Sequence, residues 1–315
     1  MTDKIIMGID TSNYTTSVAL MYSDGELIAN IKRPLPVKAG ERGLRQSDAV
    51  FAHIKNLPSA MEEAGKYLTS IHPSAIGVSE RPRNVEGSYM PCFLAGVASA
   101  LGISNTLNIP LYRFSHQCGH IMSALYSSNA DFENKEFGAF HISGGTTELL
   151  LAKRTDNGFS CELVGGTRDL NAGQVIDRVG VYLGLPFPAG AHLEKLAQEY
   201  SGKYVHKKPA TDGTYMNLSG LENMAIQLYD KTADKGAVAS FVFDYIASSI
   251  ESVSSAFIEK YGNLPMVFAG GVMCNGIIKS RIREKFSSYF AEPSMSADNA
   301  VGIAELTRLS YLIDQ

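Results

Sequence analysis

The chain is poor in cysteine and has no long apolar run. Its four cysteines form no Cys-x-x-Cys pair, which argues against a disulfide framework and against a structural zinc knuckle. We expect them to be reduced. No stretch approaches the ~18 apolar residues of a membrane span. Residues 1–7 carry one lysine and no long apolar segment, so neither a signal nor a transit peptide is expected. These absences predict a cytoplasmic protein without a membrane partner.

An excess of positive charge is also missing. The formal net charge is -4, so the chain as a whole offers no basic surface for nucleic acid. Any RNA contact must be local or shared with a partner. Arg42, Arg45, Arg81 and Arg83 are candidates for a local basic patch, although a solvated charged face is the more usual explanation.

The order of the expected strands indicates an internal duplication. Two groups of three strands are expected, at 5–10, 17–22 and 26–31 and again at 137–142, 147–152 and 161–165. A single offset of 133 residues separates Asp10 from Ser143 and Gly25 from Gly158. A duplicated unit is the economical interpretation.

Segments with helical period follow each group of strands. They cover residues 48–67, 172–183, 190–200 and 221–261, with an irregular loop expected at 201–219. Short strands are expected at 74–78, 106–112 and 266–268. This alternation predicts an α/β fold with two duplicated lobes and a cleft between them. We expect an N-terminal lobe at 1–112, with 300–315 packing back on it, and a C-terminal lobe at 113–299 that carries the metal and nucleotide site.

Three glycine-containing segments have the composition of a phosphate or nucleotide site. They are Gly8–Ser12, Ser143–Thr147 and Ala269–Asn275. Glycine lets backbone N–H groups approach an anion, and the start of a following helix assists at the third segment. A tight turn without a ligand is the alternative for each. Three such segments, two of them at duplicated positions, favour a nucleotide.

A histidine pair forms the second chemical signal. His116 and His120 lie in a segment, 115–126, that predicts a helix capped by Ser115. Histidines four residues apart share a helical face, the spacing for two ligands of one Zn or Fe ion. Asp298 is the candidate third ligand. Two hydrogen-bonded histidines without a metal are the alternative.

Zinc proteolysis is disfavoured at this pair. Gln117 stands where an HExxH helix carries its general-base glutamate, and a neutral amide cannot take a proton from water. The other histidines at 53, 72, 192 and 206 are interpreted as structural. His141 remains open because it leads directly into the turn at 143–145.

Several motifs occur together in a recognisable order through nearly the whole chain, which resembles the tRNA threonylcarbamoyl-adenosine synthase family. This family, once called O-sialoglycoprotein endopeptidases, is a branch of the actin, Hsp70 and sugar-kinase superfamily. The matching stretches are Gly8–Ser12, His116 with His120, Ser143–Gly145, Ala172–Gly173 through Asp177–Arg178, Leu183–Leu185, Pro188 with Gly190, Ser219–Leu221, Gly270–Val272 with Asn275, and Asp298–Asn299.

The resemblance implies transfer of a threonylcarbamoyl group from threonylcarbamoyl-adenylate to N6 of adenosine 37 in tRNA. A separate enzyme would make the adenylate from threonine, bicarbonate and ATP. Fe(II) or Zn(II) would be held by His116, His120 and Asp298, and the catalytic residues would be Asp10, Thr11 and Ser12. The residues implied for an adenine nucleotide (threonylcarbamoyl-AMP, ATP or AMP) are His141, Ile142, Ser143, Gly144, Gly145, Asp177, Gly190, Gly270, Gly271 and Asn275.

The sequence also departs from the family pattern. Asn13, Tyr14, Thr15 and Thr16 stand where the family has Cys-Asp-Glu-Thr, so two carboxylates are missing. Other departures are Thr146 for histidine, Gln174 for glutamate, Glu222 for a basic residue, and Ser79–Arg83 for a glycine-rich turn. Two alternatives therefore stay open: a nucleotide-dependent phosphotransferase or ATPase, and an inactive nucleotide-binding partner of an authentic synthase. A protein partner or a homodimer fits either.

Overall fold

A computed structural model describes residues 4–12, 14–36, 44–68, 72–130, 132, 135–156 and 158–315. Asn13 and Arg42 lie outside these residues. The chain divides into two compact units, which are described separately here. Among the described residues, unit 1 takes those up to 131 together with 154–160 and 294–315, and unit 2 takes 132–153 and 161–293.

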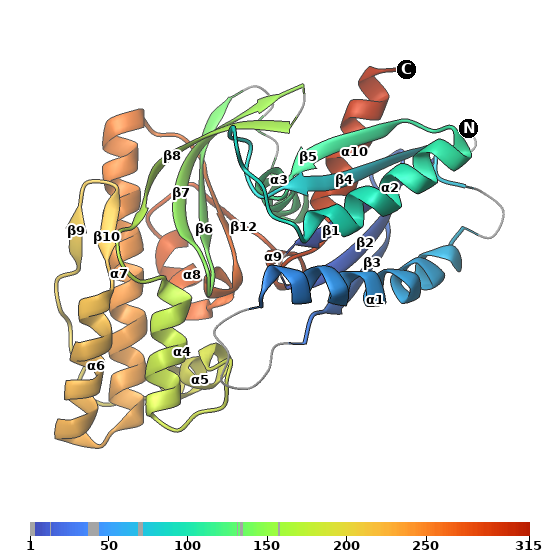
Figure 1. Cartoon of the computed structure of the whole chain (residues 1–315). Helices are drawn as coiled ribbons and strands as arrows, with labels where there is room; N and C mark the ends of the chain where they lie inside the picture. The colour runs from blue at the N-terminus through green and yellow to red at the C-terminus, as the bar shows by residue number, and fades with distance from the viewer. Residues whose placement is uncertain are drawn as a thin grey trace. The chain divides into compact units, whose positions relative to one another are not determined.

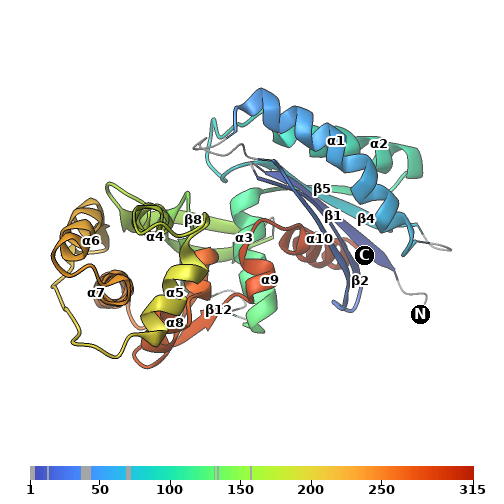
Figure 2. The ribbon, with the colours of Figure 1, turned by 90° about the horizontal axis from the view of Figure 1, so that it is seen from below.

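Unit 1 is built on a five-stranded sheet of order β3-β2-β1-β4-β5. The first three strands are antiparallel, and β4 and β5 run parallel to β1. Helices α1 and α2 cover one face, and α3 and α10 lie on the other (Figures 1 and 2). The elements are β1 (Ile5–Ser12), β2 (Thr15–Tyr22), β3 (Leu27–Pro34), α1 (Gln46–Gly65), β4 (Ala75–Arg81), α2 (Phe93–Leu107), β5 (Leu111–Ser115), α3 (His116–Ser128) and α10 (Val301–Ile313).

Helices on both faces explain why β1 is apolar along most of its length. Every residue of β1 is buried, as expected for a strand covered on both sides. Ile9 and Val78 face the core under α1 and α2. Gly8 lies under α10, where an added Cβ would come within 2.6 Å of the backbone nitrogen of Ala304. The glycine therefore lets helix α10 approach the central strand.

Unit 2 contains a seven-stranded sheet of order β12-β11-β6-β7-β8-β10-β9. Its long helix α7 is buried along most of its length. Its elements are β6 (Glu136–Ile142), β7 (Thr147–Thr155), β8 (Gly158–Thr167), α4 (Ala172–Tyr182), α5 (Gly190–Glu199), β9 (Ala210–Asp212), β10 (Tyr215–Asn217), α6 (Ser219–Thr232), α7 (Lys235–Tyr261), β11 (Met266–Ala269), the 3-10 helix η1 (Gly271–Cys274), α8 (Gly276–Arg283) and β12 (Ser288–Phe290). The short helix α9 (Pro293–Ser296) follows, and all of it except Pro293 belongs to unit 1.

The two sheets share one topology, which confirms the duplicated α/β fold. The order β3-β2-β1-β4-β5 in unit 1 corresponds to β8-β7-β6-β11-β12 in unit 2. In both, the first and second strands are antiparallel while the central strand is parallel to its other neighbour. Gly25 and Gly158, at equivalent positions, both have positive φ, 99° and 113°.

Helix α7 is long and apolar enough to cross a membrane by length and composition. However, 72% of its apolar stretch is buried within the protein. Phe243, Ile250 and Phe257 pack into the main core of unit 2. Its apolar character therefore fits a central core helix.

The two compact units differ from the expected lobes at 1–112 and 113–299. Helix α3 belongs to unit 1, because it packs against α10, which in turn packs on β1 and β4. The metal candidates therefore lie in unit 1 and not in the C-terminal lobe. The C-terminal helix does pack back on unit 1, as α10.

Some element boundaries also differ from the sequence-based expectation. Residues 106–107 complete α2, which Asn108 ends in a left-handed conformation with φ 51°, so strand β5 begins only at Leu111. The segment 221–261 is two helices, because Ala233 adopts φ 50° and Asp234 caps α7. The loop at 201–219 contains the short strands β9 and β10.

Replacing Gly8 tests how tightly α10 packs on β1. We expect Gly8→Ala to lower the free energy of unfolding by about 1–3 kcal/mol, because the new methyl group meets backbone atoms that cannot move aside. Gly102→Ala is the control, since a Cβ there meets nothing within 4 Å and alanine favours the helix by up to about 1 kcal/mol. Urea denaturation measures both. Equal stability of the two variants would contradict this packing.

Candidate metal and nucleotide sites

Helix α3 presents His116 and His120 on one face. Ser115 caps the helix, its hydroxyl accepting a hydrogen bond of 3.2 Å from the backbone N–H of Cys118. This confirms the predicted helix and its cap. The centroids of the two imidazole rings are 4.3 Å apart. The four-residue spacing therefore does bring the rings together.

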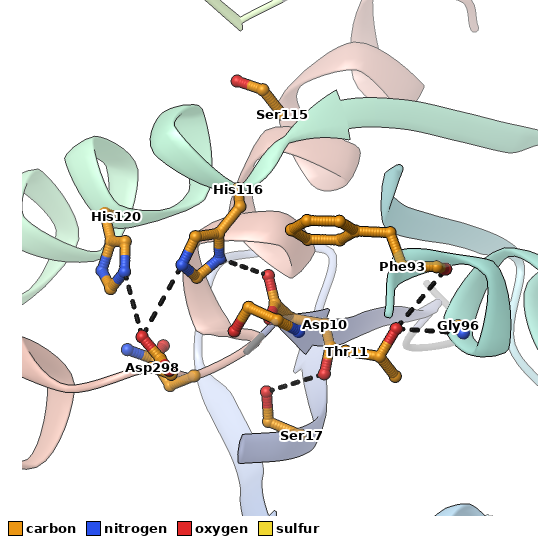
Figure 3. Close-up of polar contacts among 12 residues, drawn as sticks. Asp10, Thr11, Ser17, Phe93, Gly96, Ser115, His116, His120 and Asp298 are labelled. Atoms are coloured by element: carbon orange, nitrogen blue, oxygen red, sulfur yellow. Dashed lines mark hydrogen bonds and ion pairs between the residues drawn. The ribbon is translucent and has the colours of Figure 1, made fainter. Parts of the chain in front are cut away.

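Asp298 completes a cluster with the two histidines. Its Oδ1 lies 3.2 Å from Nε2 of His120 and 3.6 Å from Nε2 of His116 (Figure 3). One ligand atom from each residue can be chosen so that all three lie within 4.8 Å of one another. Asp298 comes from the segment before α10, so the packing of α10 on α3 brings the three residues together.

Asp10 fixes the orientation of the His116 ring. Its Oδ2 lies 2.7 Å from Nδ1 of His116, and its Oδ1 accepts a hydrogen bond of 2.9 Å from the Ser12 N–H. The Asp10 side chain is 1% exposed, so solvent does not compete for these bonds. A carboxylate at Nδ1 keeps one proton there, so Nε2 is the nitrogen that can bind a metal ion once its own proton has been displaced.

Burial and charge shift the pKa values of this cluster in opposite senses. Burial alone would lower the pKa of His116, but the charges of Asp10 and Asp298 and their hydrogen bonds raise it to about 10. Burial would raise the pKa of Asp298, but hydrogen bonds from the two histidines and their charges hold it well below its usual value. The pKa of Asp10 is likewise lowered by His116 against the effect of burial. The cluster is therefore ion-paired without a metal.

The donor set fits a transition-metal ion. Two imidazole nitrogens and one carboxylate oxygen suit Fe(II) and Zn(II) alike. Near Asp10, the hydroxyl of Ser12 is buried without a hydrogen-bond partner among the described residues. Ser79 on β4 shares this feature; it follows Val78, the partner of Ile9, as Asp10 follows Ile9 on β1. A buried hydroxyl without a partner is uncommon, and a bound ion or ligand is one way to satisfy it.

Thr11, expected with Asp10 and Ser12 as catalytic, points the other way. Its hydroxyl donates to the carbonyl of Cys92 at 3.1 Å and accepts from the Gly96 N–H at 3.0 Å. Together with a longer contact of 3.5 Å to the carbonyl of Phe93, these bonds attach the start of α2 to β1; Figure 3 shows those to Phe93 and Gly96. The segment 8–12 is also a buried strand and not a phosphate-binding turn, because Gly8 serves helix packing. The turn expected here therefore does not lie within residues 8–12, and their part in a nucleotide site stays a prediction.

His53 was interpreted from the sequence as a structural residue. His53 on α1 is fully buried, and its Nδ1 lies 2.8 Å from the hydroxyl of Thr16. Burial lowers its pKa, opposed by the Ser12 backbone and by the charges of Asp10 and Asp298. The imidazole thus lies within the electrostatic reach of the metal candidates, a proximity that no spacing in the sequence signals.

In unit 2, the turn after β6 lies against the start of α4. The Ser143 N–H donates to the carbonyl of Thr146 at 2.7 Å and closes the turn, while Gly144 and Gly145 are exposed. The Gly173 N–H donates to the carbonyl of Ser143 at 3.2 Å. A Cβ on Gly173 would lie 2.7 Å from the Gly144 backbone. Glycine at 173 therefore allows this close approach.

The third glycine segment meets the end of β6. Gly270 has φ 95°, and a Cβ there would overlap the carbonyl of Ile142 and lie 2.8 Å from the ring of His141. Gly271 is exposed at the start of η1. Asn275 is buried and caps α8 by accepting from the Ile278 N–H at 3.0 Å. Strands β6 and β11 run parallel, so their ends bring the nucleotide candidates at 141–145 together with Gly270, Gly271 and Asn275 at one end of the sheet.

Asp177 and Gly190 meet at the start of α5. The Oδ1 of Asp177 accepts a hydrogen bond of 2.8 Å from the Ala189 N–H, directly before Gly190. Burial raises the pKa of Asp177.

The two groups of candidate residues belong to different units. All three candidate metal ligands lie in unit 1, and all the candidate nucleotide-binding residues lie in unit 2.

Several departures from the family pattern have structural partners. Gln174 completes a capping box with Asn171 at the start of α4, a function that glutamate and glutamine share. Glu222 forms an ion pair of 3.2 Å with Arg178. In the suggested basic patch, Arg81 pairs with Glu80, and the side chains of Arg45 and Arg83 lie at the surface. The patch is therefore partly neutralised.

Comparison with solved structures assigns the fold class. Full-length HypF in its phosphate- and nucleotide-bound form has a TM-score of 0.60 at 12% identity, covering 100% of this chain and 57% of HypF. Component A of the (R)-2-hydroxyglutaryl-CoA dehydratase of Acidaminococcus fermentans has a TM-score of 0.56 at 16% identity, covering 97% of this chain and 98% of that one. These neighbours, with a ROK family glucokinase from Streptomyces griseus, define a protein of the actin, Hsp70 and sugar-kinase fold class.

Sequence comparison identifies the family within this class. A family model for TsaD, tRNA N6-adenosine threonylcarbamoyltransferase, matches residues 33–305. The enzyme of that name from Streptococcus suis is 29% identical, covering 90% of this chain and 84% of its own length. The one from Bacillus cereus is also 29% identical, covering 98% and 92%. The chain belongs to the TsaD family.

The raised pKa of His116 predicts how the stability of the metal-free protein depends on pH. A folded-state pKa of about 10 against an ordinary 6.5 stabilises the fold fully below pH 6.5, and this contribution is lost as the pH rises through 10. We expect Asp10→Asn to lose less stability than wild type over that interval. Denaturation of both proteins in a chelator at several pH values measures this. Parallel curves would contradict the ion pair.

The close approach of Gly173 to the turn at 143–145 predicts that this position controls nucleotide binding. We expect Gly173→Ala to weaken AMP binding at least tenfold, because the methyl group displaces the Gly144 backbone. Gly220→Ala, at the start of α6, is the control, since a Cβ there meets nothing within 4 Å. Calorimetric titration with AMP measures both. Equal affinities would show that the turn at 143–145 takes no part in binding.

Proposed function

We propose that this chain transfers the threonylcarbamoyl group of threonylcarbamoyl-adenylate to N6 of adenosine 37 in tRNA. Membership of the TsaD family supports this reaction. The main structural support is the cluster formed by His116, His120 and Asp298. In this cluster Asp10 is hydrogen-bonded to Nδ1 of His116. An exocyclic amine is a weak nucleophile, so the carbonyl that it attacks needs electrostatic activation.

The metal-binding part of the proposal rests on unit 1. Fe(II) or Zn(II) would be held by Nε2 of His116, Nε2 of His120 and the carboxylate of Asp298. When bound, such an ion supplies Lewis-acid polarisation of the carbamoyl carbonyl or orients the adenylate. Asp10 would keep the proton on Nδ1 of His116, so that Nε2 gives up its own proton and becomes the electron-pair donor. The buried Ser12 hydroxyl is available to donate a hydrogen bond near this site.

The adenylate-binding part rests on unit 2. The exposed glycines of the turn at 143–145 leave room for the phosphate oxygens, and Gly271 at the start of η1 offers backbone of the same kind. Asp177 holds the start of α5 through Ala189, and its carboxylate is the acceptor we assign to the ribose hydroxyls. A separate enzyme that produces the carbamoyl-adenylate is the partner that this reaction requires.

A modification assay tests the proposal directly. The purified, metal-loaded chain is incubated with threonylcarbamoyl-adenylate and unmodified tRNA, and the digested nucleosides are analysed by mass spectrometry. We expect threonylcarbamoyl-adenosine to form with wild type and its rate to fall at least 100-fold in His116→Ala, which removes a ligand. Chelation of the metal is expected to have the same effect.

His72→Ala is a matched control for the loss of an imidazole. His72 lies outside the cluster, with its Nδ1 near the carbonyl of Pro73, so this variant is expected to retain full activity. No product with wild-type protein that binds both metal and AMP would contradict the transferase. That result would instead support a nucleotide-binding partner of another synthase.

A further inference from the structure

A serine and an asparagine join α3 to the segment that carries Asp298. The Ser123 hydroxyl donates to Oδ1 of Asn299 at 2.8 Å and accepts from the Gly302 N–H at 3.0 Å. Ser123 is fully buried and Asn299 is 4% exposed. Ser123 lies three residues after His120, hence on the same face of the helix. The bond therefore connects the two ligand-bearing elements directly beside the ligands.

The amide of Asn299 is also bonded to the backbone on both sides of Asp298. Its Nδ2 donates to the carbonyl of Met295 at 2.9 Å and to that of Ala297 at 2.8 Å. Its Oδ1 accepts from the Val301 N–H at 2.9 Å. Both N–H donors and the carbonyl oxygen of this amide are thus used. The conformation of the segment 295–301 is fixed by one side chain.

Two glycines, Gly119 on α3 and Gly302 on α10, let these helices approach closely beside Ser123. A Cβ on Gly302 would overlap the carbonyl oxygen of Gly119 and lie 2.7 Å from the Ser123 nitrogen. A Cβ on Gly119 would lie 3.0 Å from the side chain of Ile303. Helix α3 therefore meets α10 through backbone, and the polar contacts of Ser123 specify one register between them.

We propose that Ser123 and Asn299 are positioning residues for the metal site, and this inference rests on the metal binding proposed above. They fix the register of α3 against the Asp298 segment, so that Nε2 of His116 and of His120 face the same carboxylate oxygen. A shift of α3 by one turn would move each imidazole by about 5.4 Å and separate it from Asp298.

Two substitutions weaken this connection in different ways. Ser123→Ala removes the bridging hydroxyl. Asn299→Asp keeps an oxygen for the Val301 N–H and for Ser123, but it places a second oxygen against the carbonyls of Met295 and Ala297. We expect the Kd for Zn²⁺ to rise about 10–100-fold in each, because misplacing the ligands should cost as much as removing a group that orients one of them.

Ser128→Ala is the matched control on the same helix. The Ser128 hydroxyl donates to the carbonyls of Ala124 and Leu125 within α3. The Kd of this variant for Zn²⁺ is expected to lie within about twofold of the wild-type value, because substitutions remote from a site act independently of it. The visible spectrum of the Co²⁺-loaded protein provides a second readout, because its bands report ligand geometry. We expect it to change in the two test variants and to stay unchanged in Ser128→Ala.

The outcomes separate this inference from the proposed function. Absence of Zn²⁺ binding by the wild-type protein overturns the proposed metal site itself. Tight wild-type binding with unchanged affinity and Co²⁺ spectrum in folded Ser123→Ala and Asn299→Asp overturns the inference alone. If Asn299→Asp does not fold, Ser123→Ala decides. Failure of both to fold, with Ser128→Ala intact, assigns the pair to the stability of unit 1 and likewise overturns the positioning role.

Discussion

The close packing of helix α10 is the constraint on which the candidate metal site depends. Helix α10 lies against β1 at Gly8, against β4 at Gly77 and against α3 at Gly119 and Gly302. Asp298 immediately precedes it, whereas Asp10 lies on β1 and the two histidines on α3. Because glycine removes the side chains from these contacts, three segments that are distant in sequence, namely β1, α3 and the segment before α10, come close enough for their polar groups to meet.

Charge balance makes this meeting compatible with burial. Two carboxylates and two imidazoles share a largely buried region, and unpaired charges there would be costly. The bonds from His116 to Asp10 and from both histidines to Asp298 offset that cost without a metal. The same arrangement holds the Nε2 atoms toward one carboxylate oxygen, so the groups are organised for a cation before it binds. Preorganised ligands are a general property of metal sites.

Local features of the sequence predicted local structure well. The helix after Ser115 and the shared face of His116 and His120 follow from capping and from the helical period, which involve only neighbouring residues. The duplication was visible because strands, turns and glycines repeat at one offset. Asp298 was expected from its residue type and its motif, but only the packing of α10 on α3 brings it to the histidines.

Contacts between distant segments lay beyond sequence reasoning. Nothing in the order of residues indicates that Asp10 bonds the ring of His116, that Gly8 serves helix packing, or that Thr11 faces away toward α2. The same holds for Ser123, whose spacing from His120 suggests a shared face but not its partner.

The most direct test of the candidate metal site is X-ray absorption spectroscopy at the K-edge of the metal bound to the purified protein. Only nitrogen and oxygen ligands, with the outer-shell scattering of two imidazoles, are expected, whereas a sulfur ligand or the absence of imidazole scattering would contradict the site.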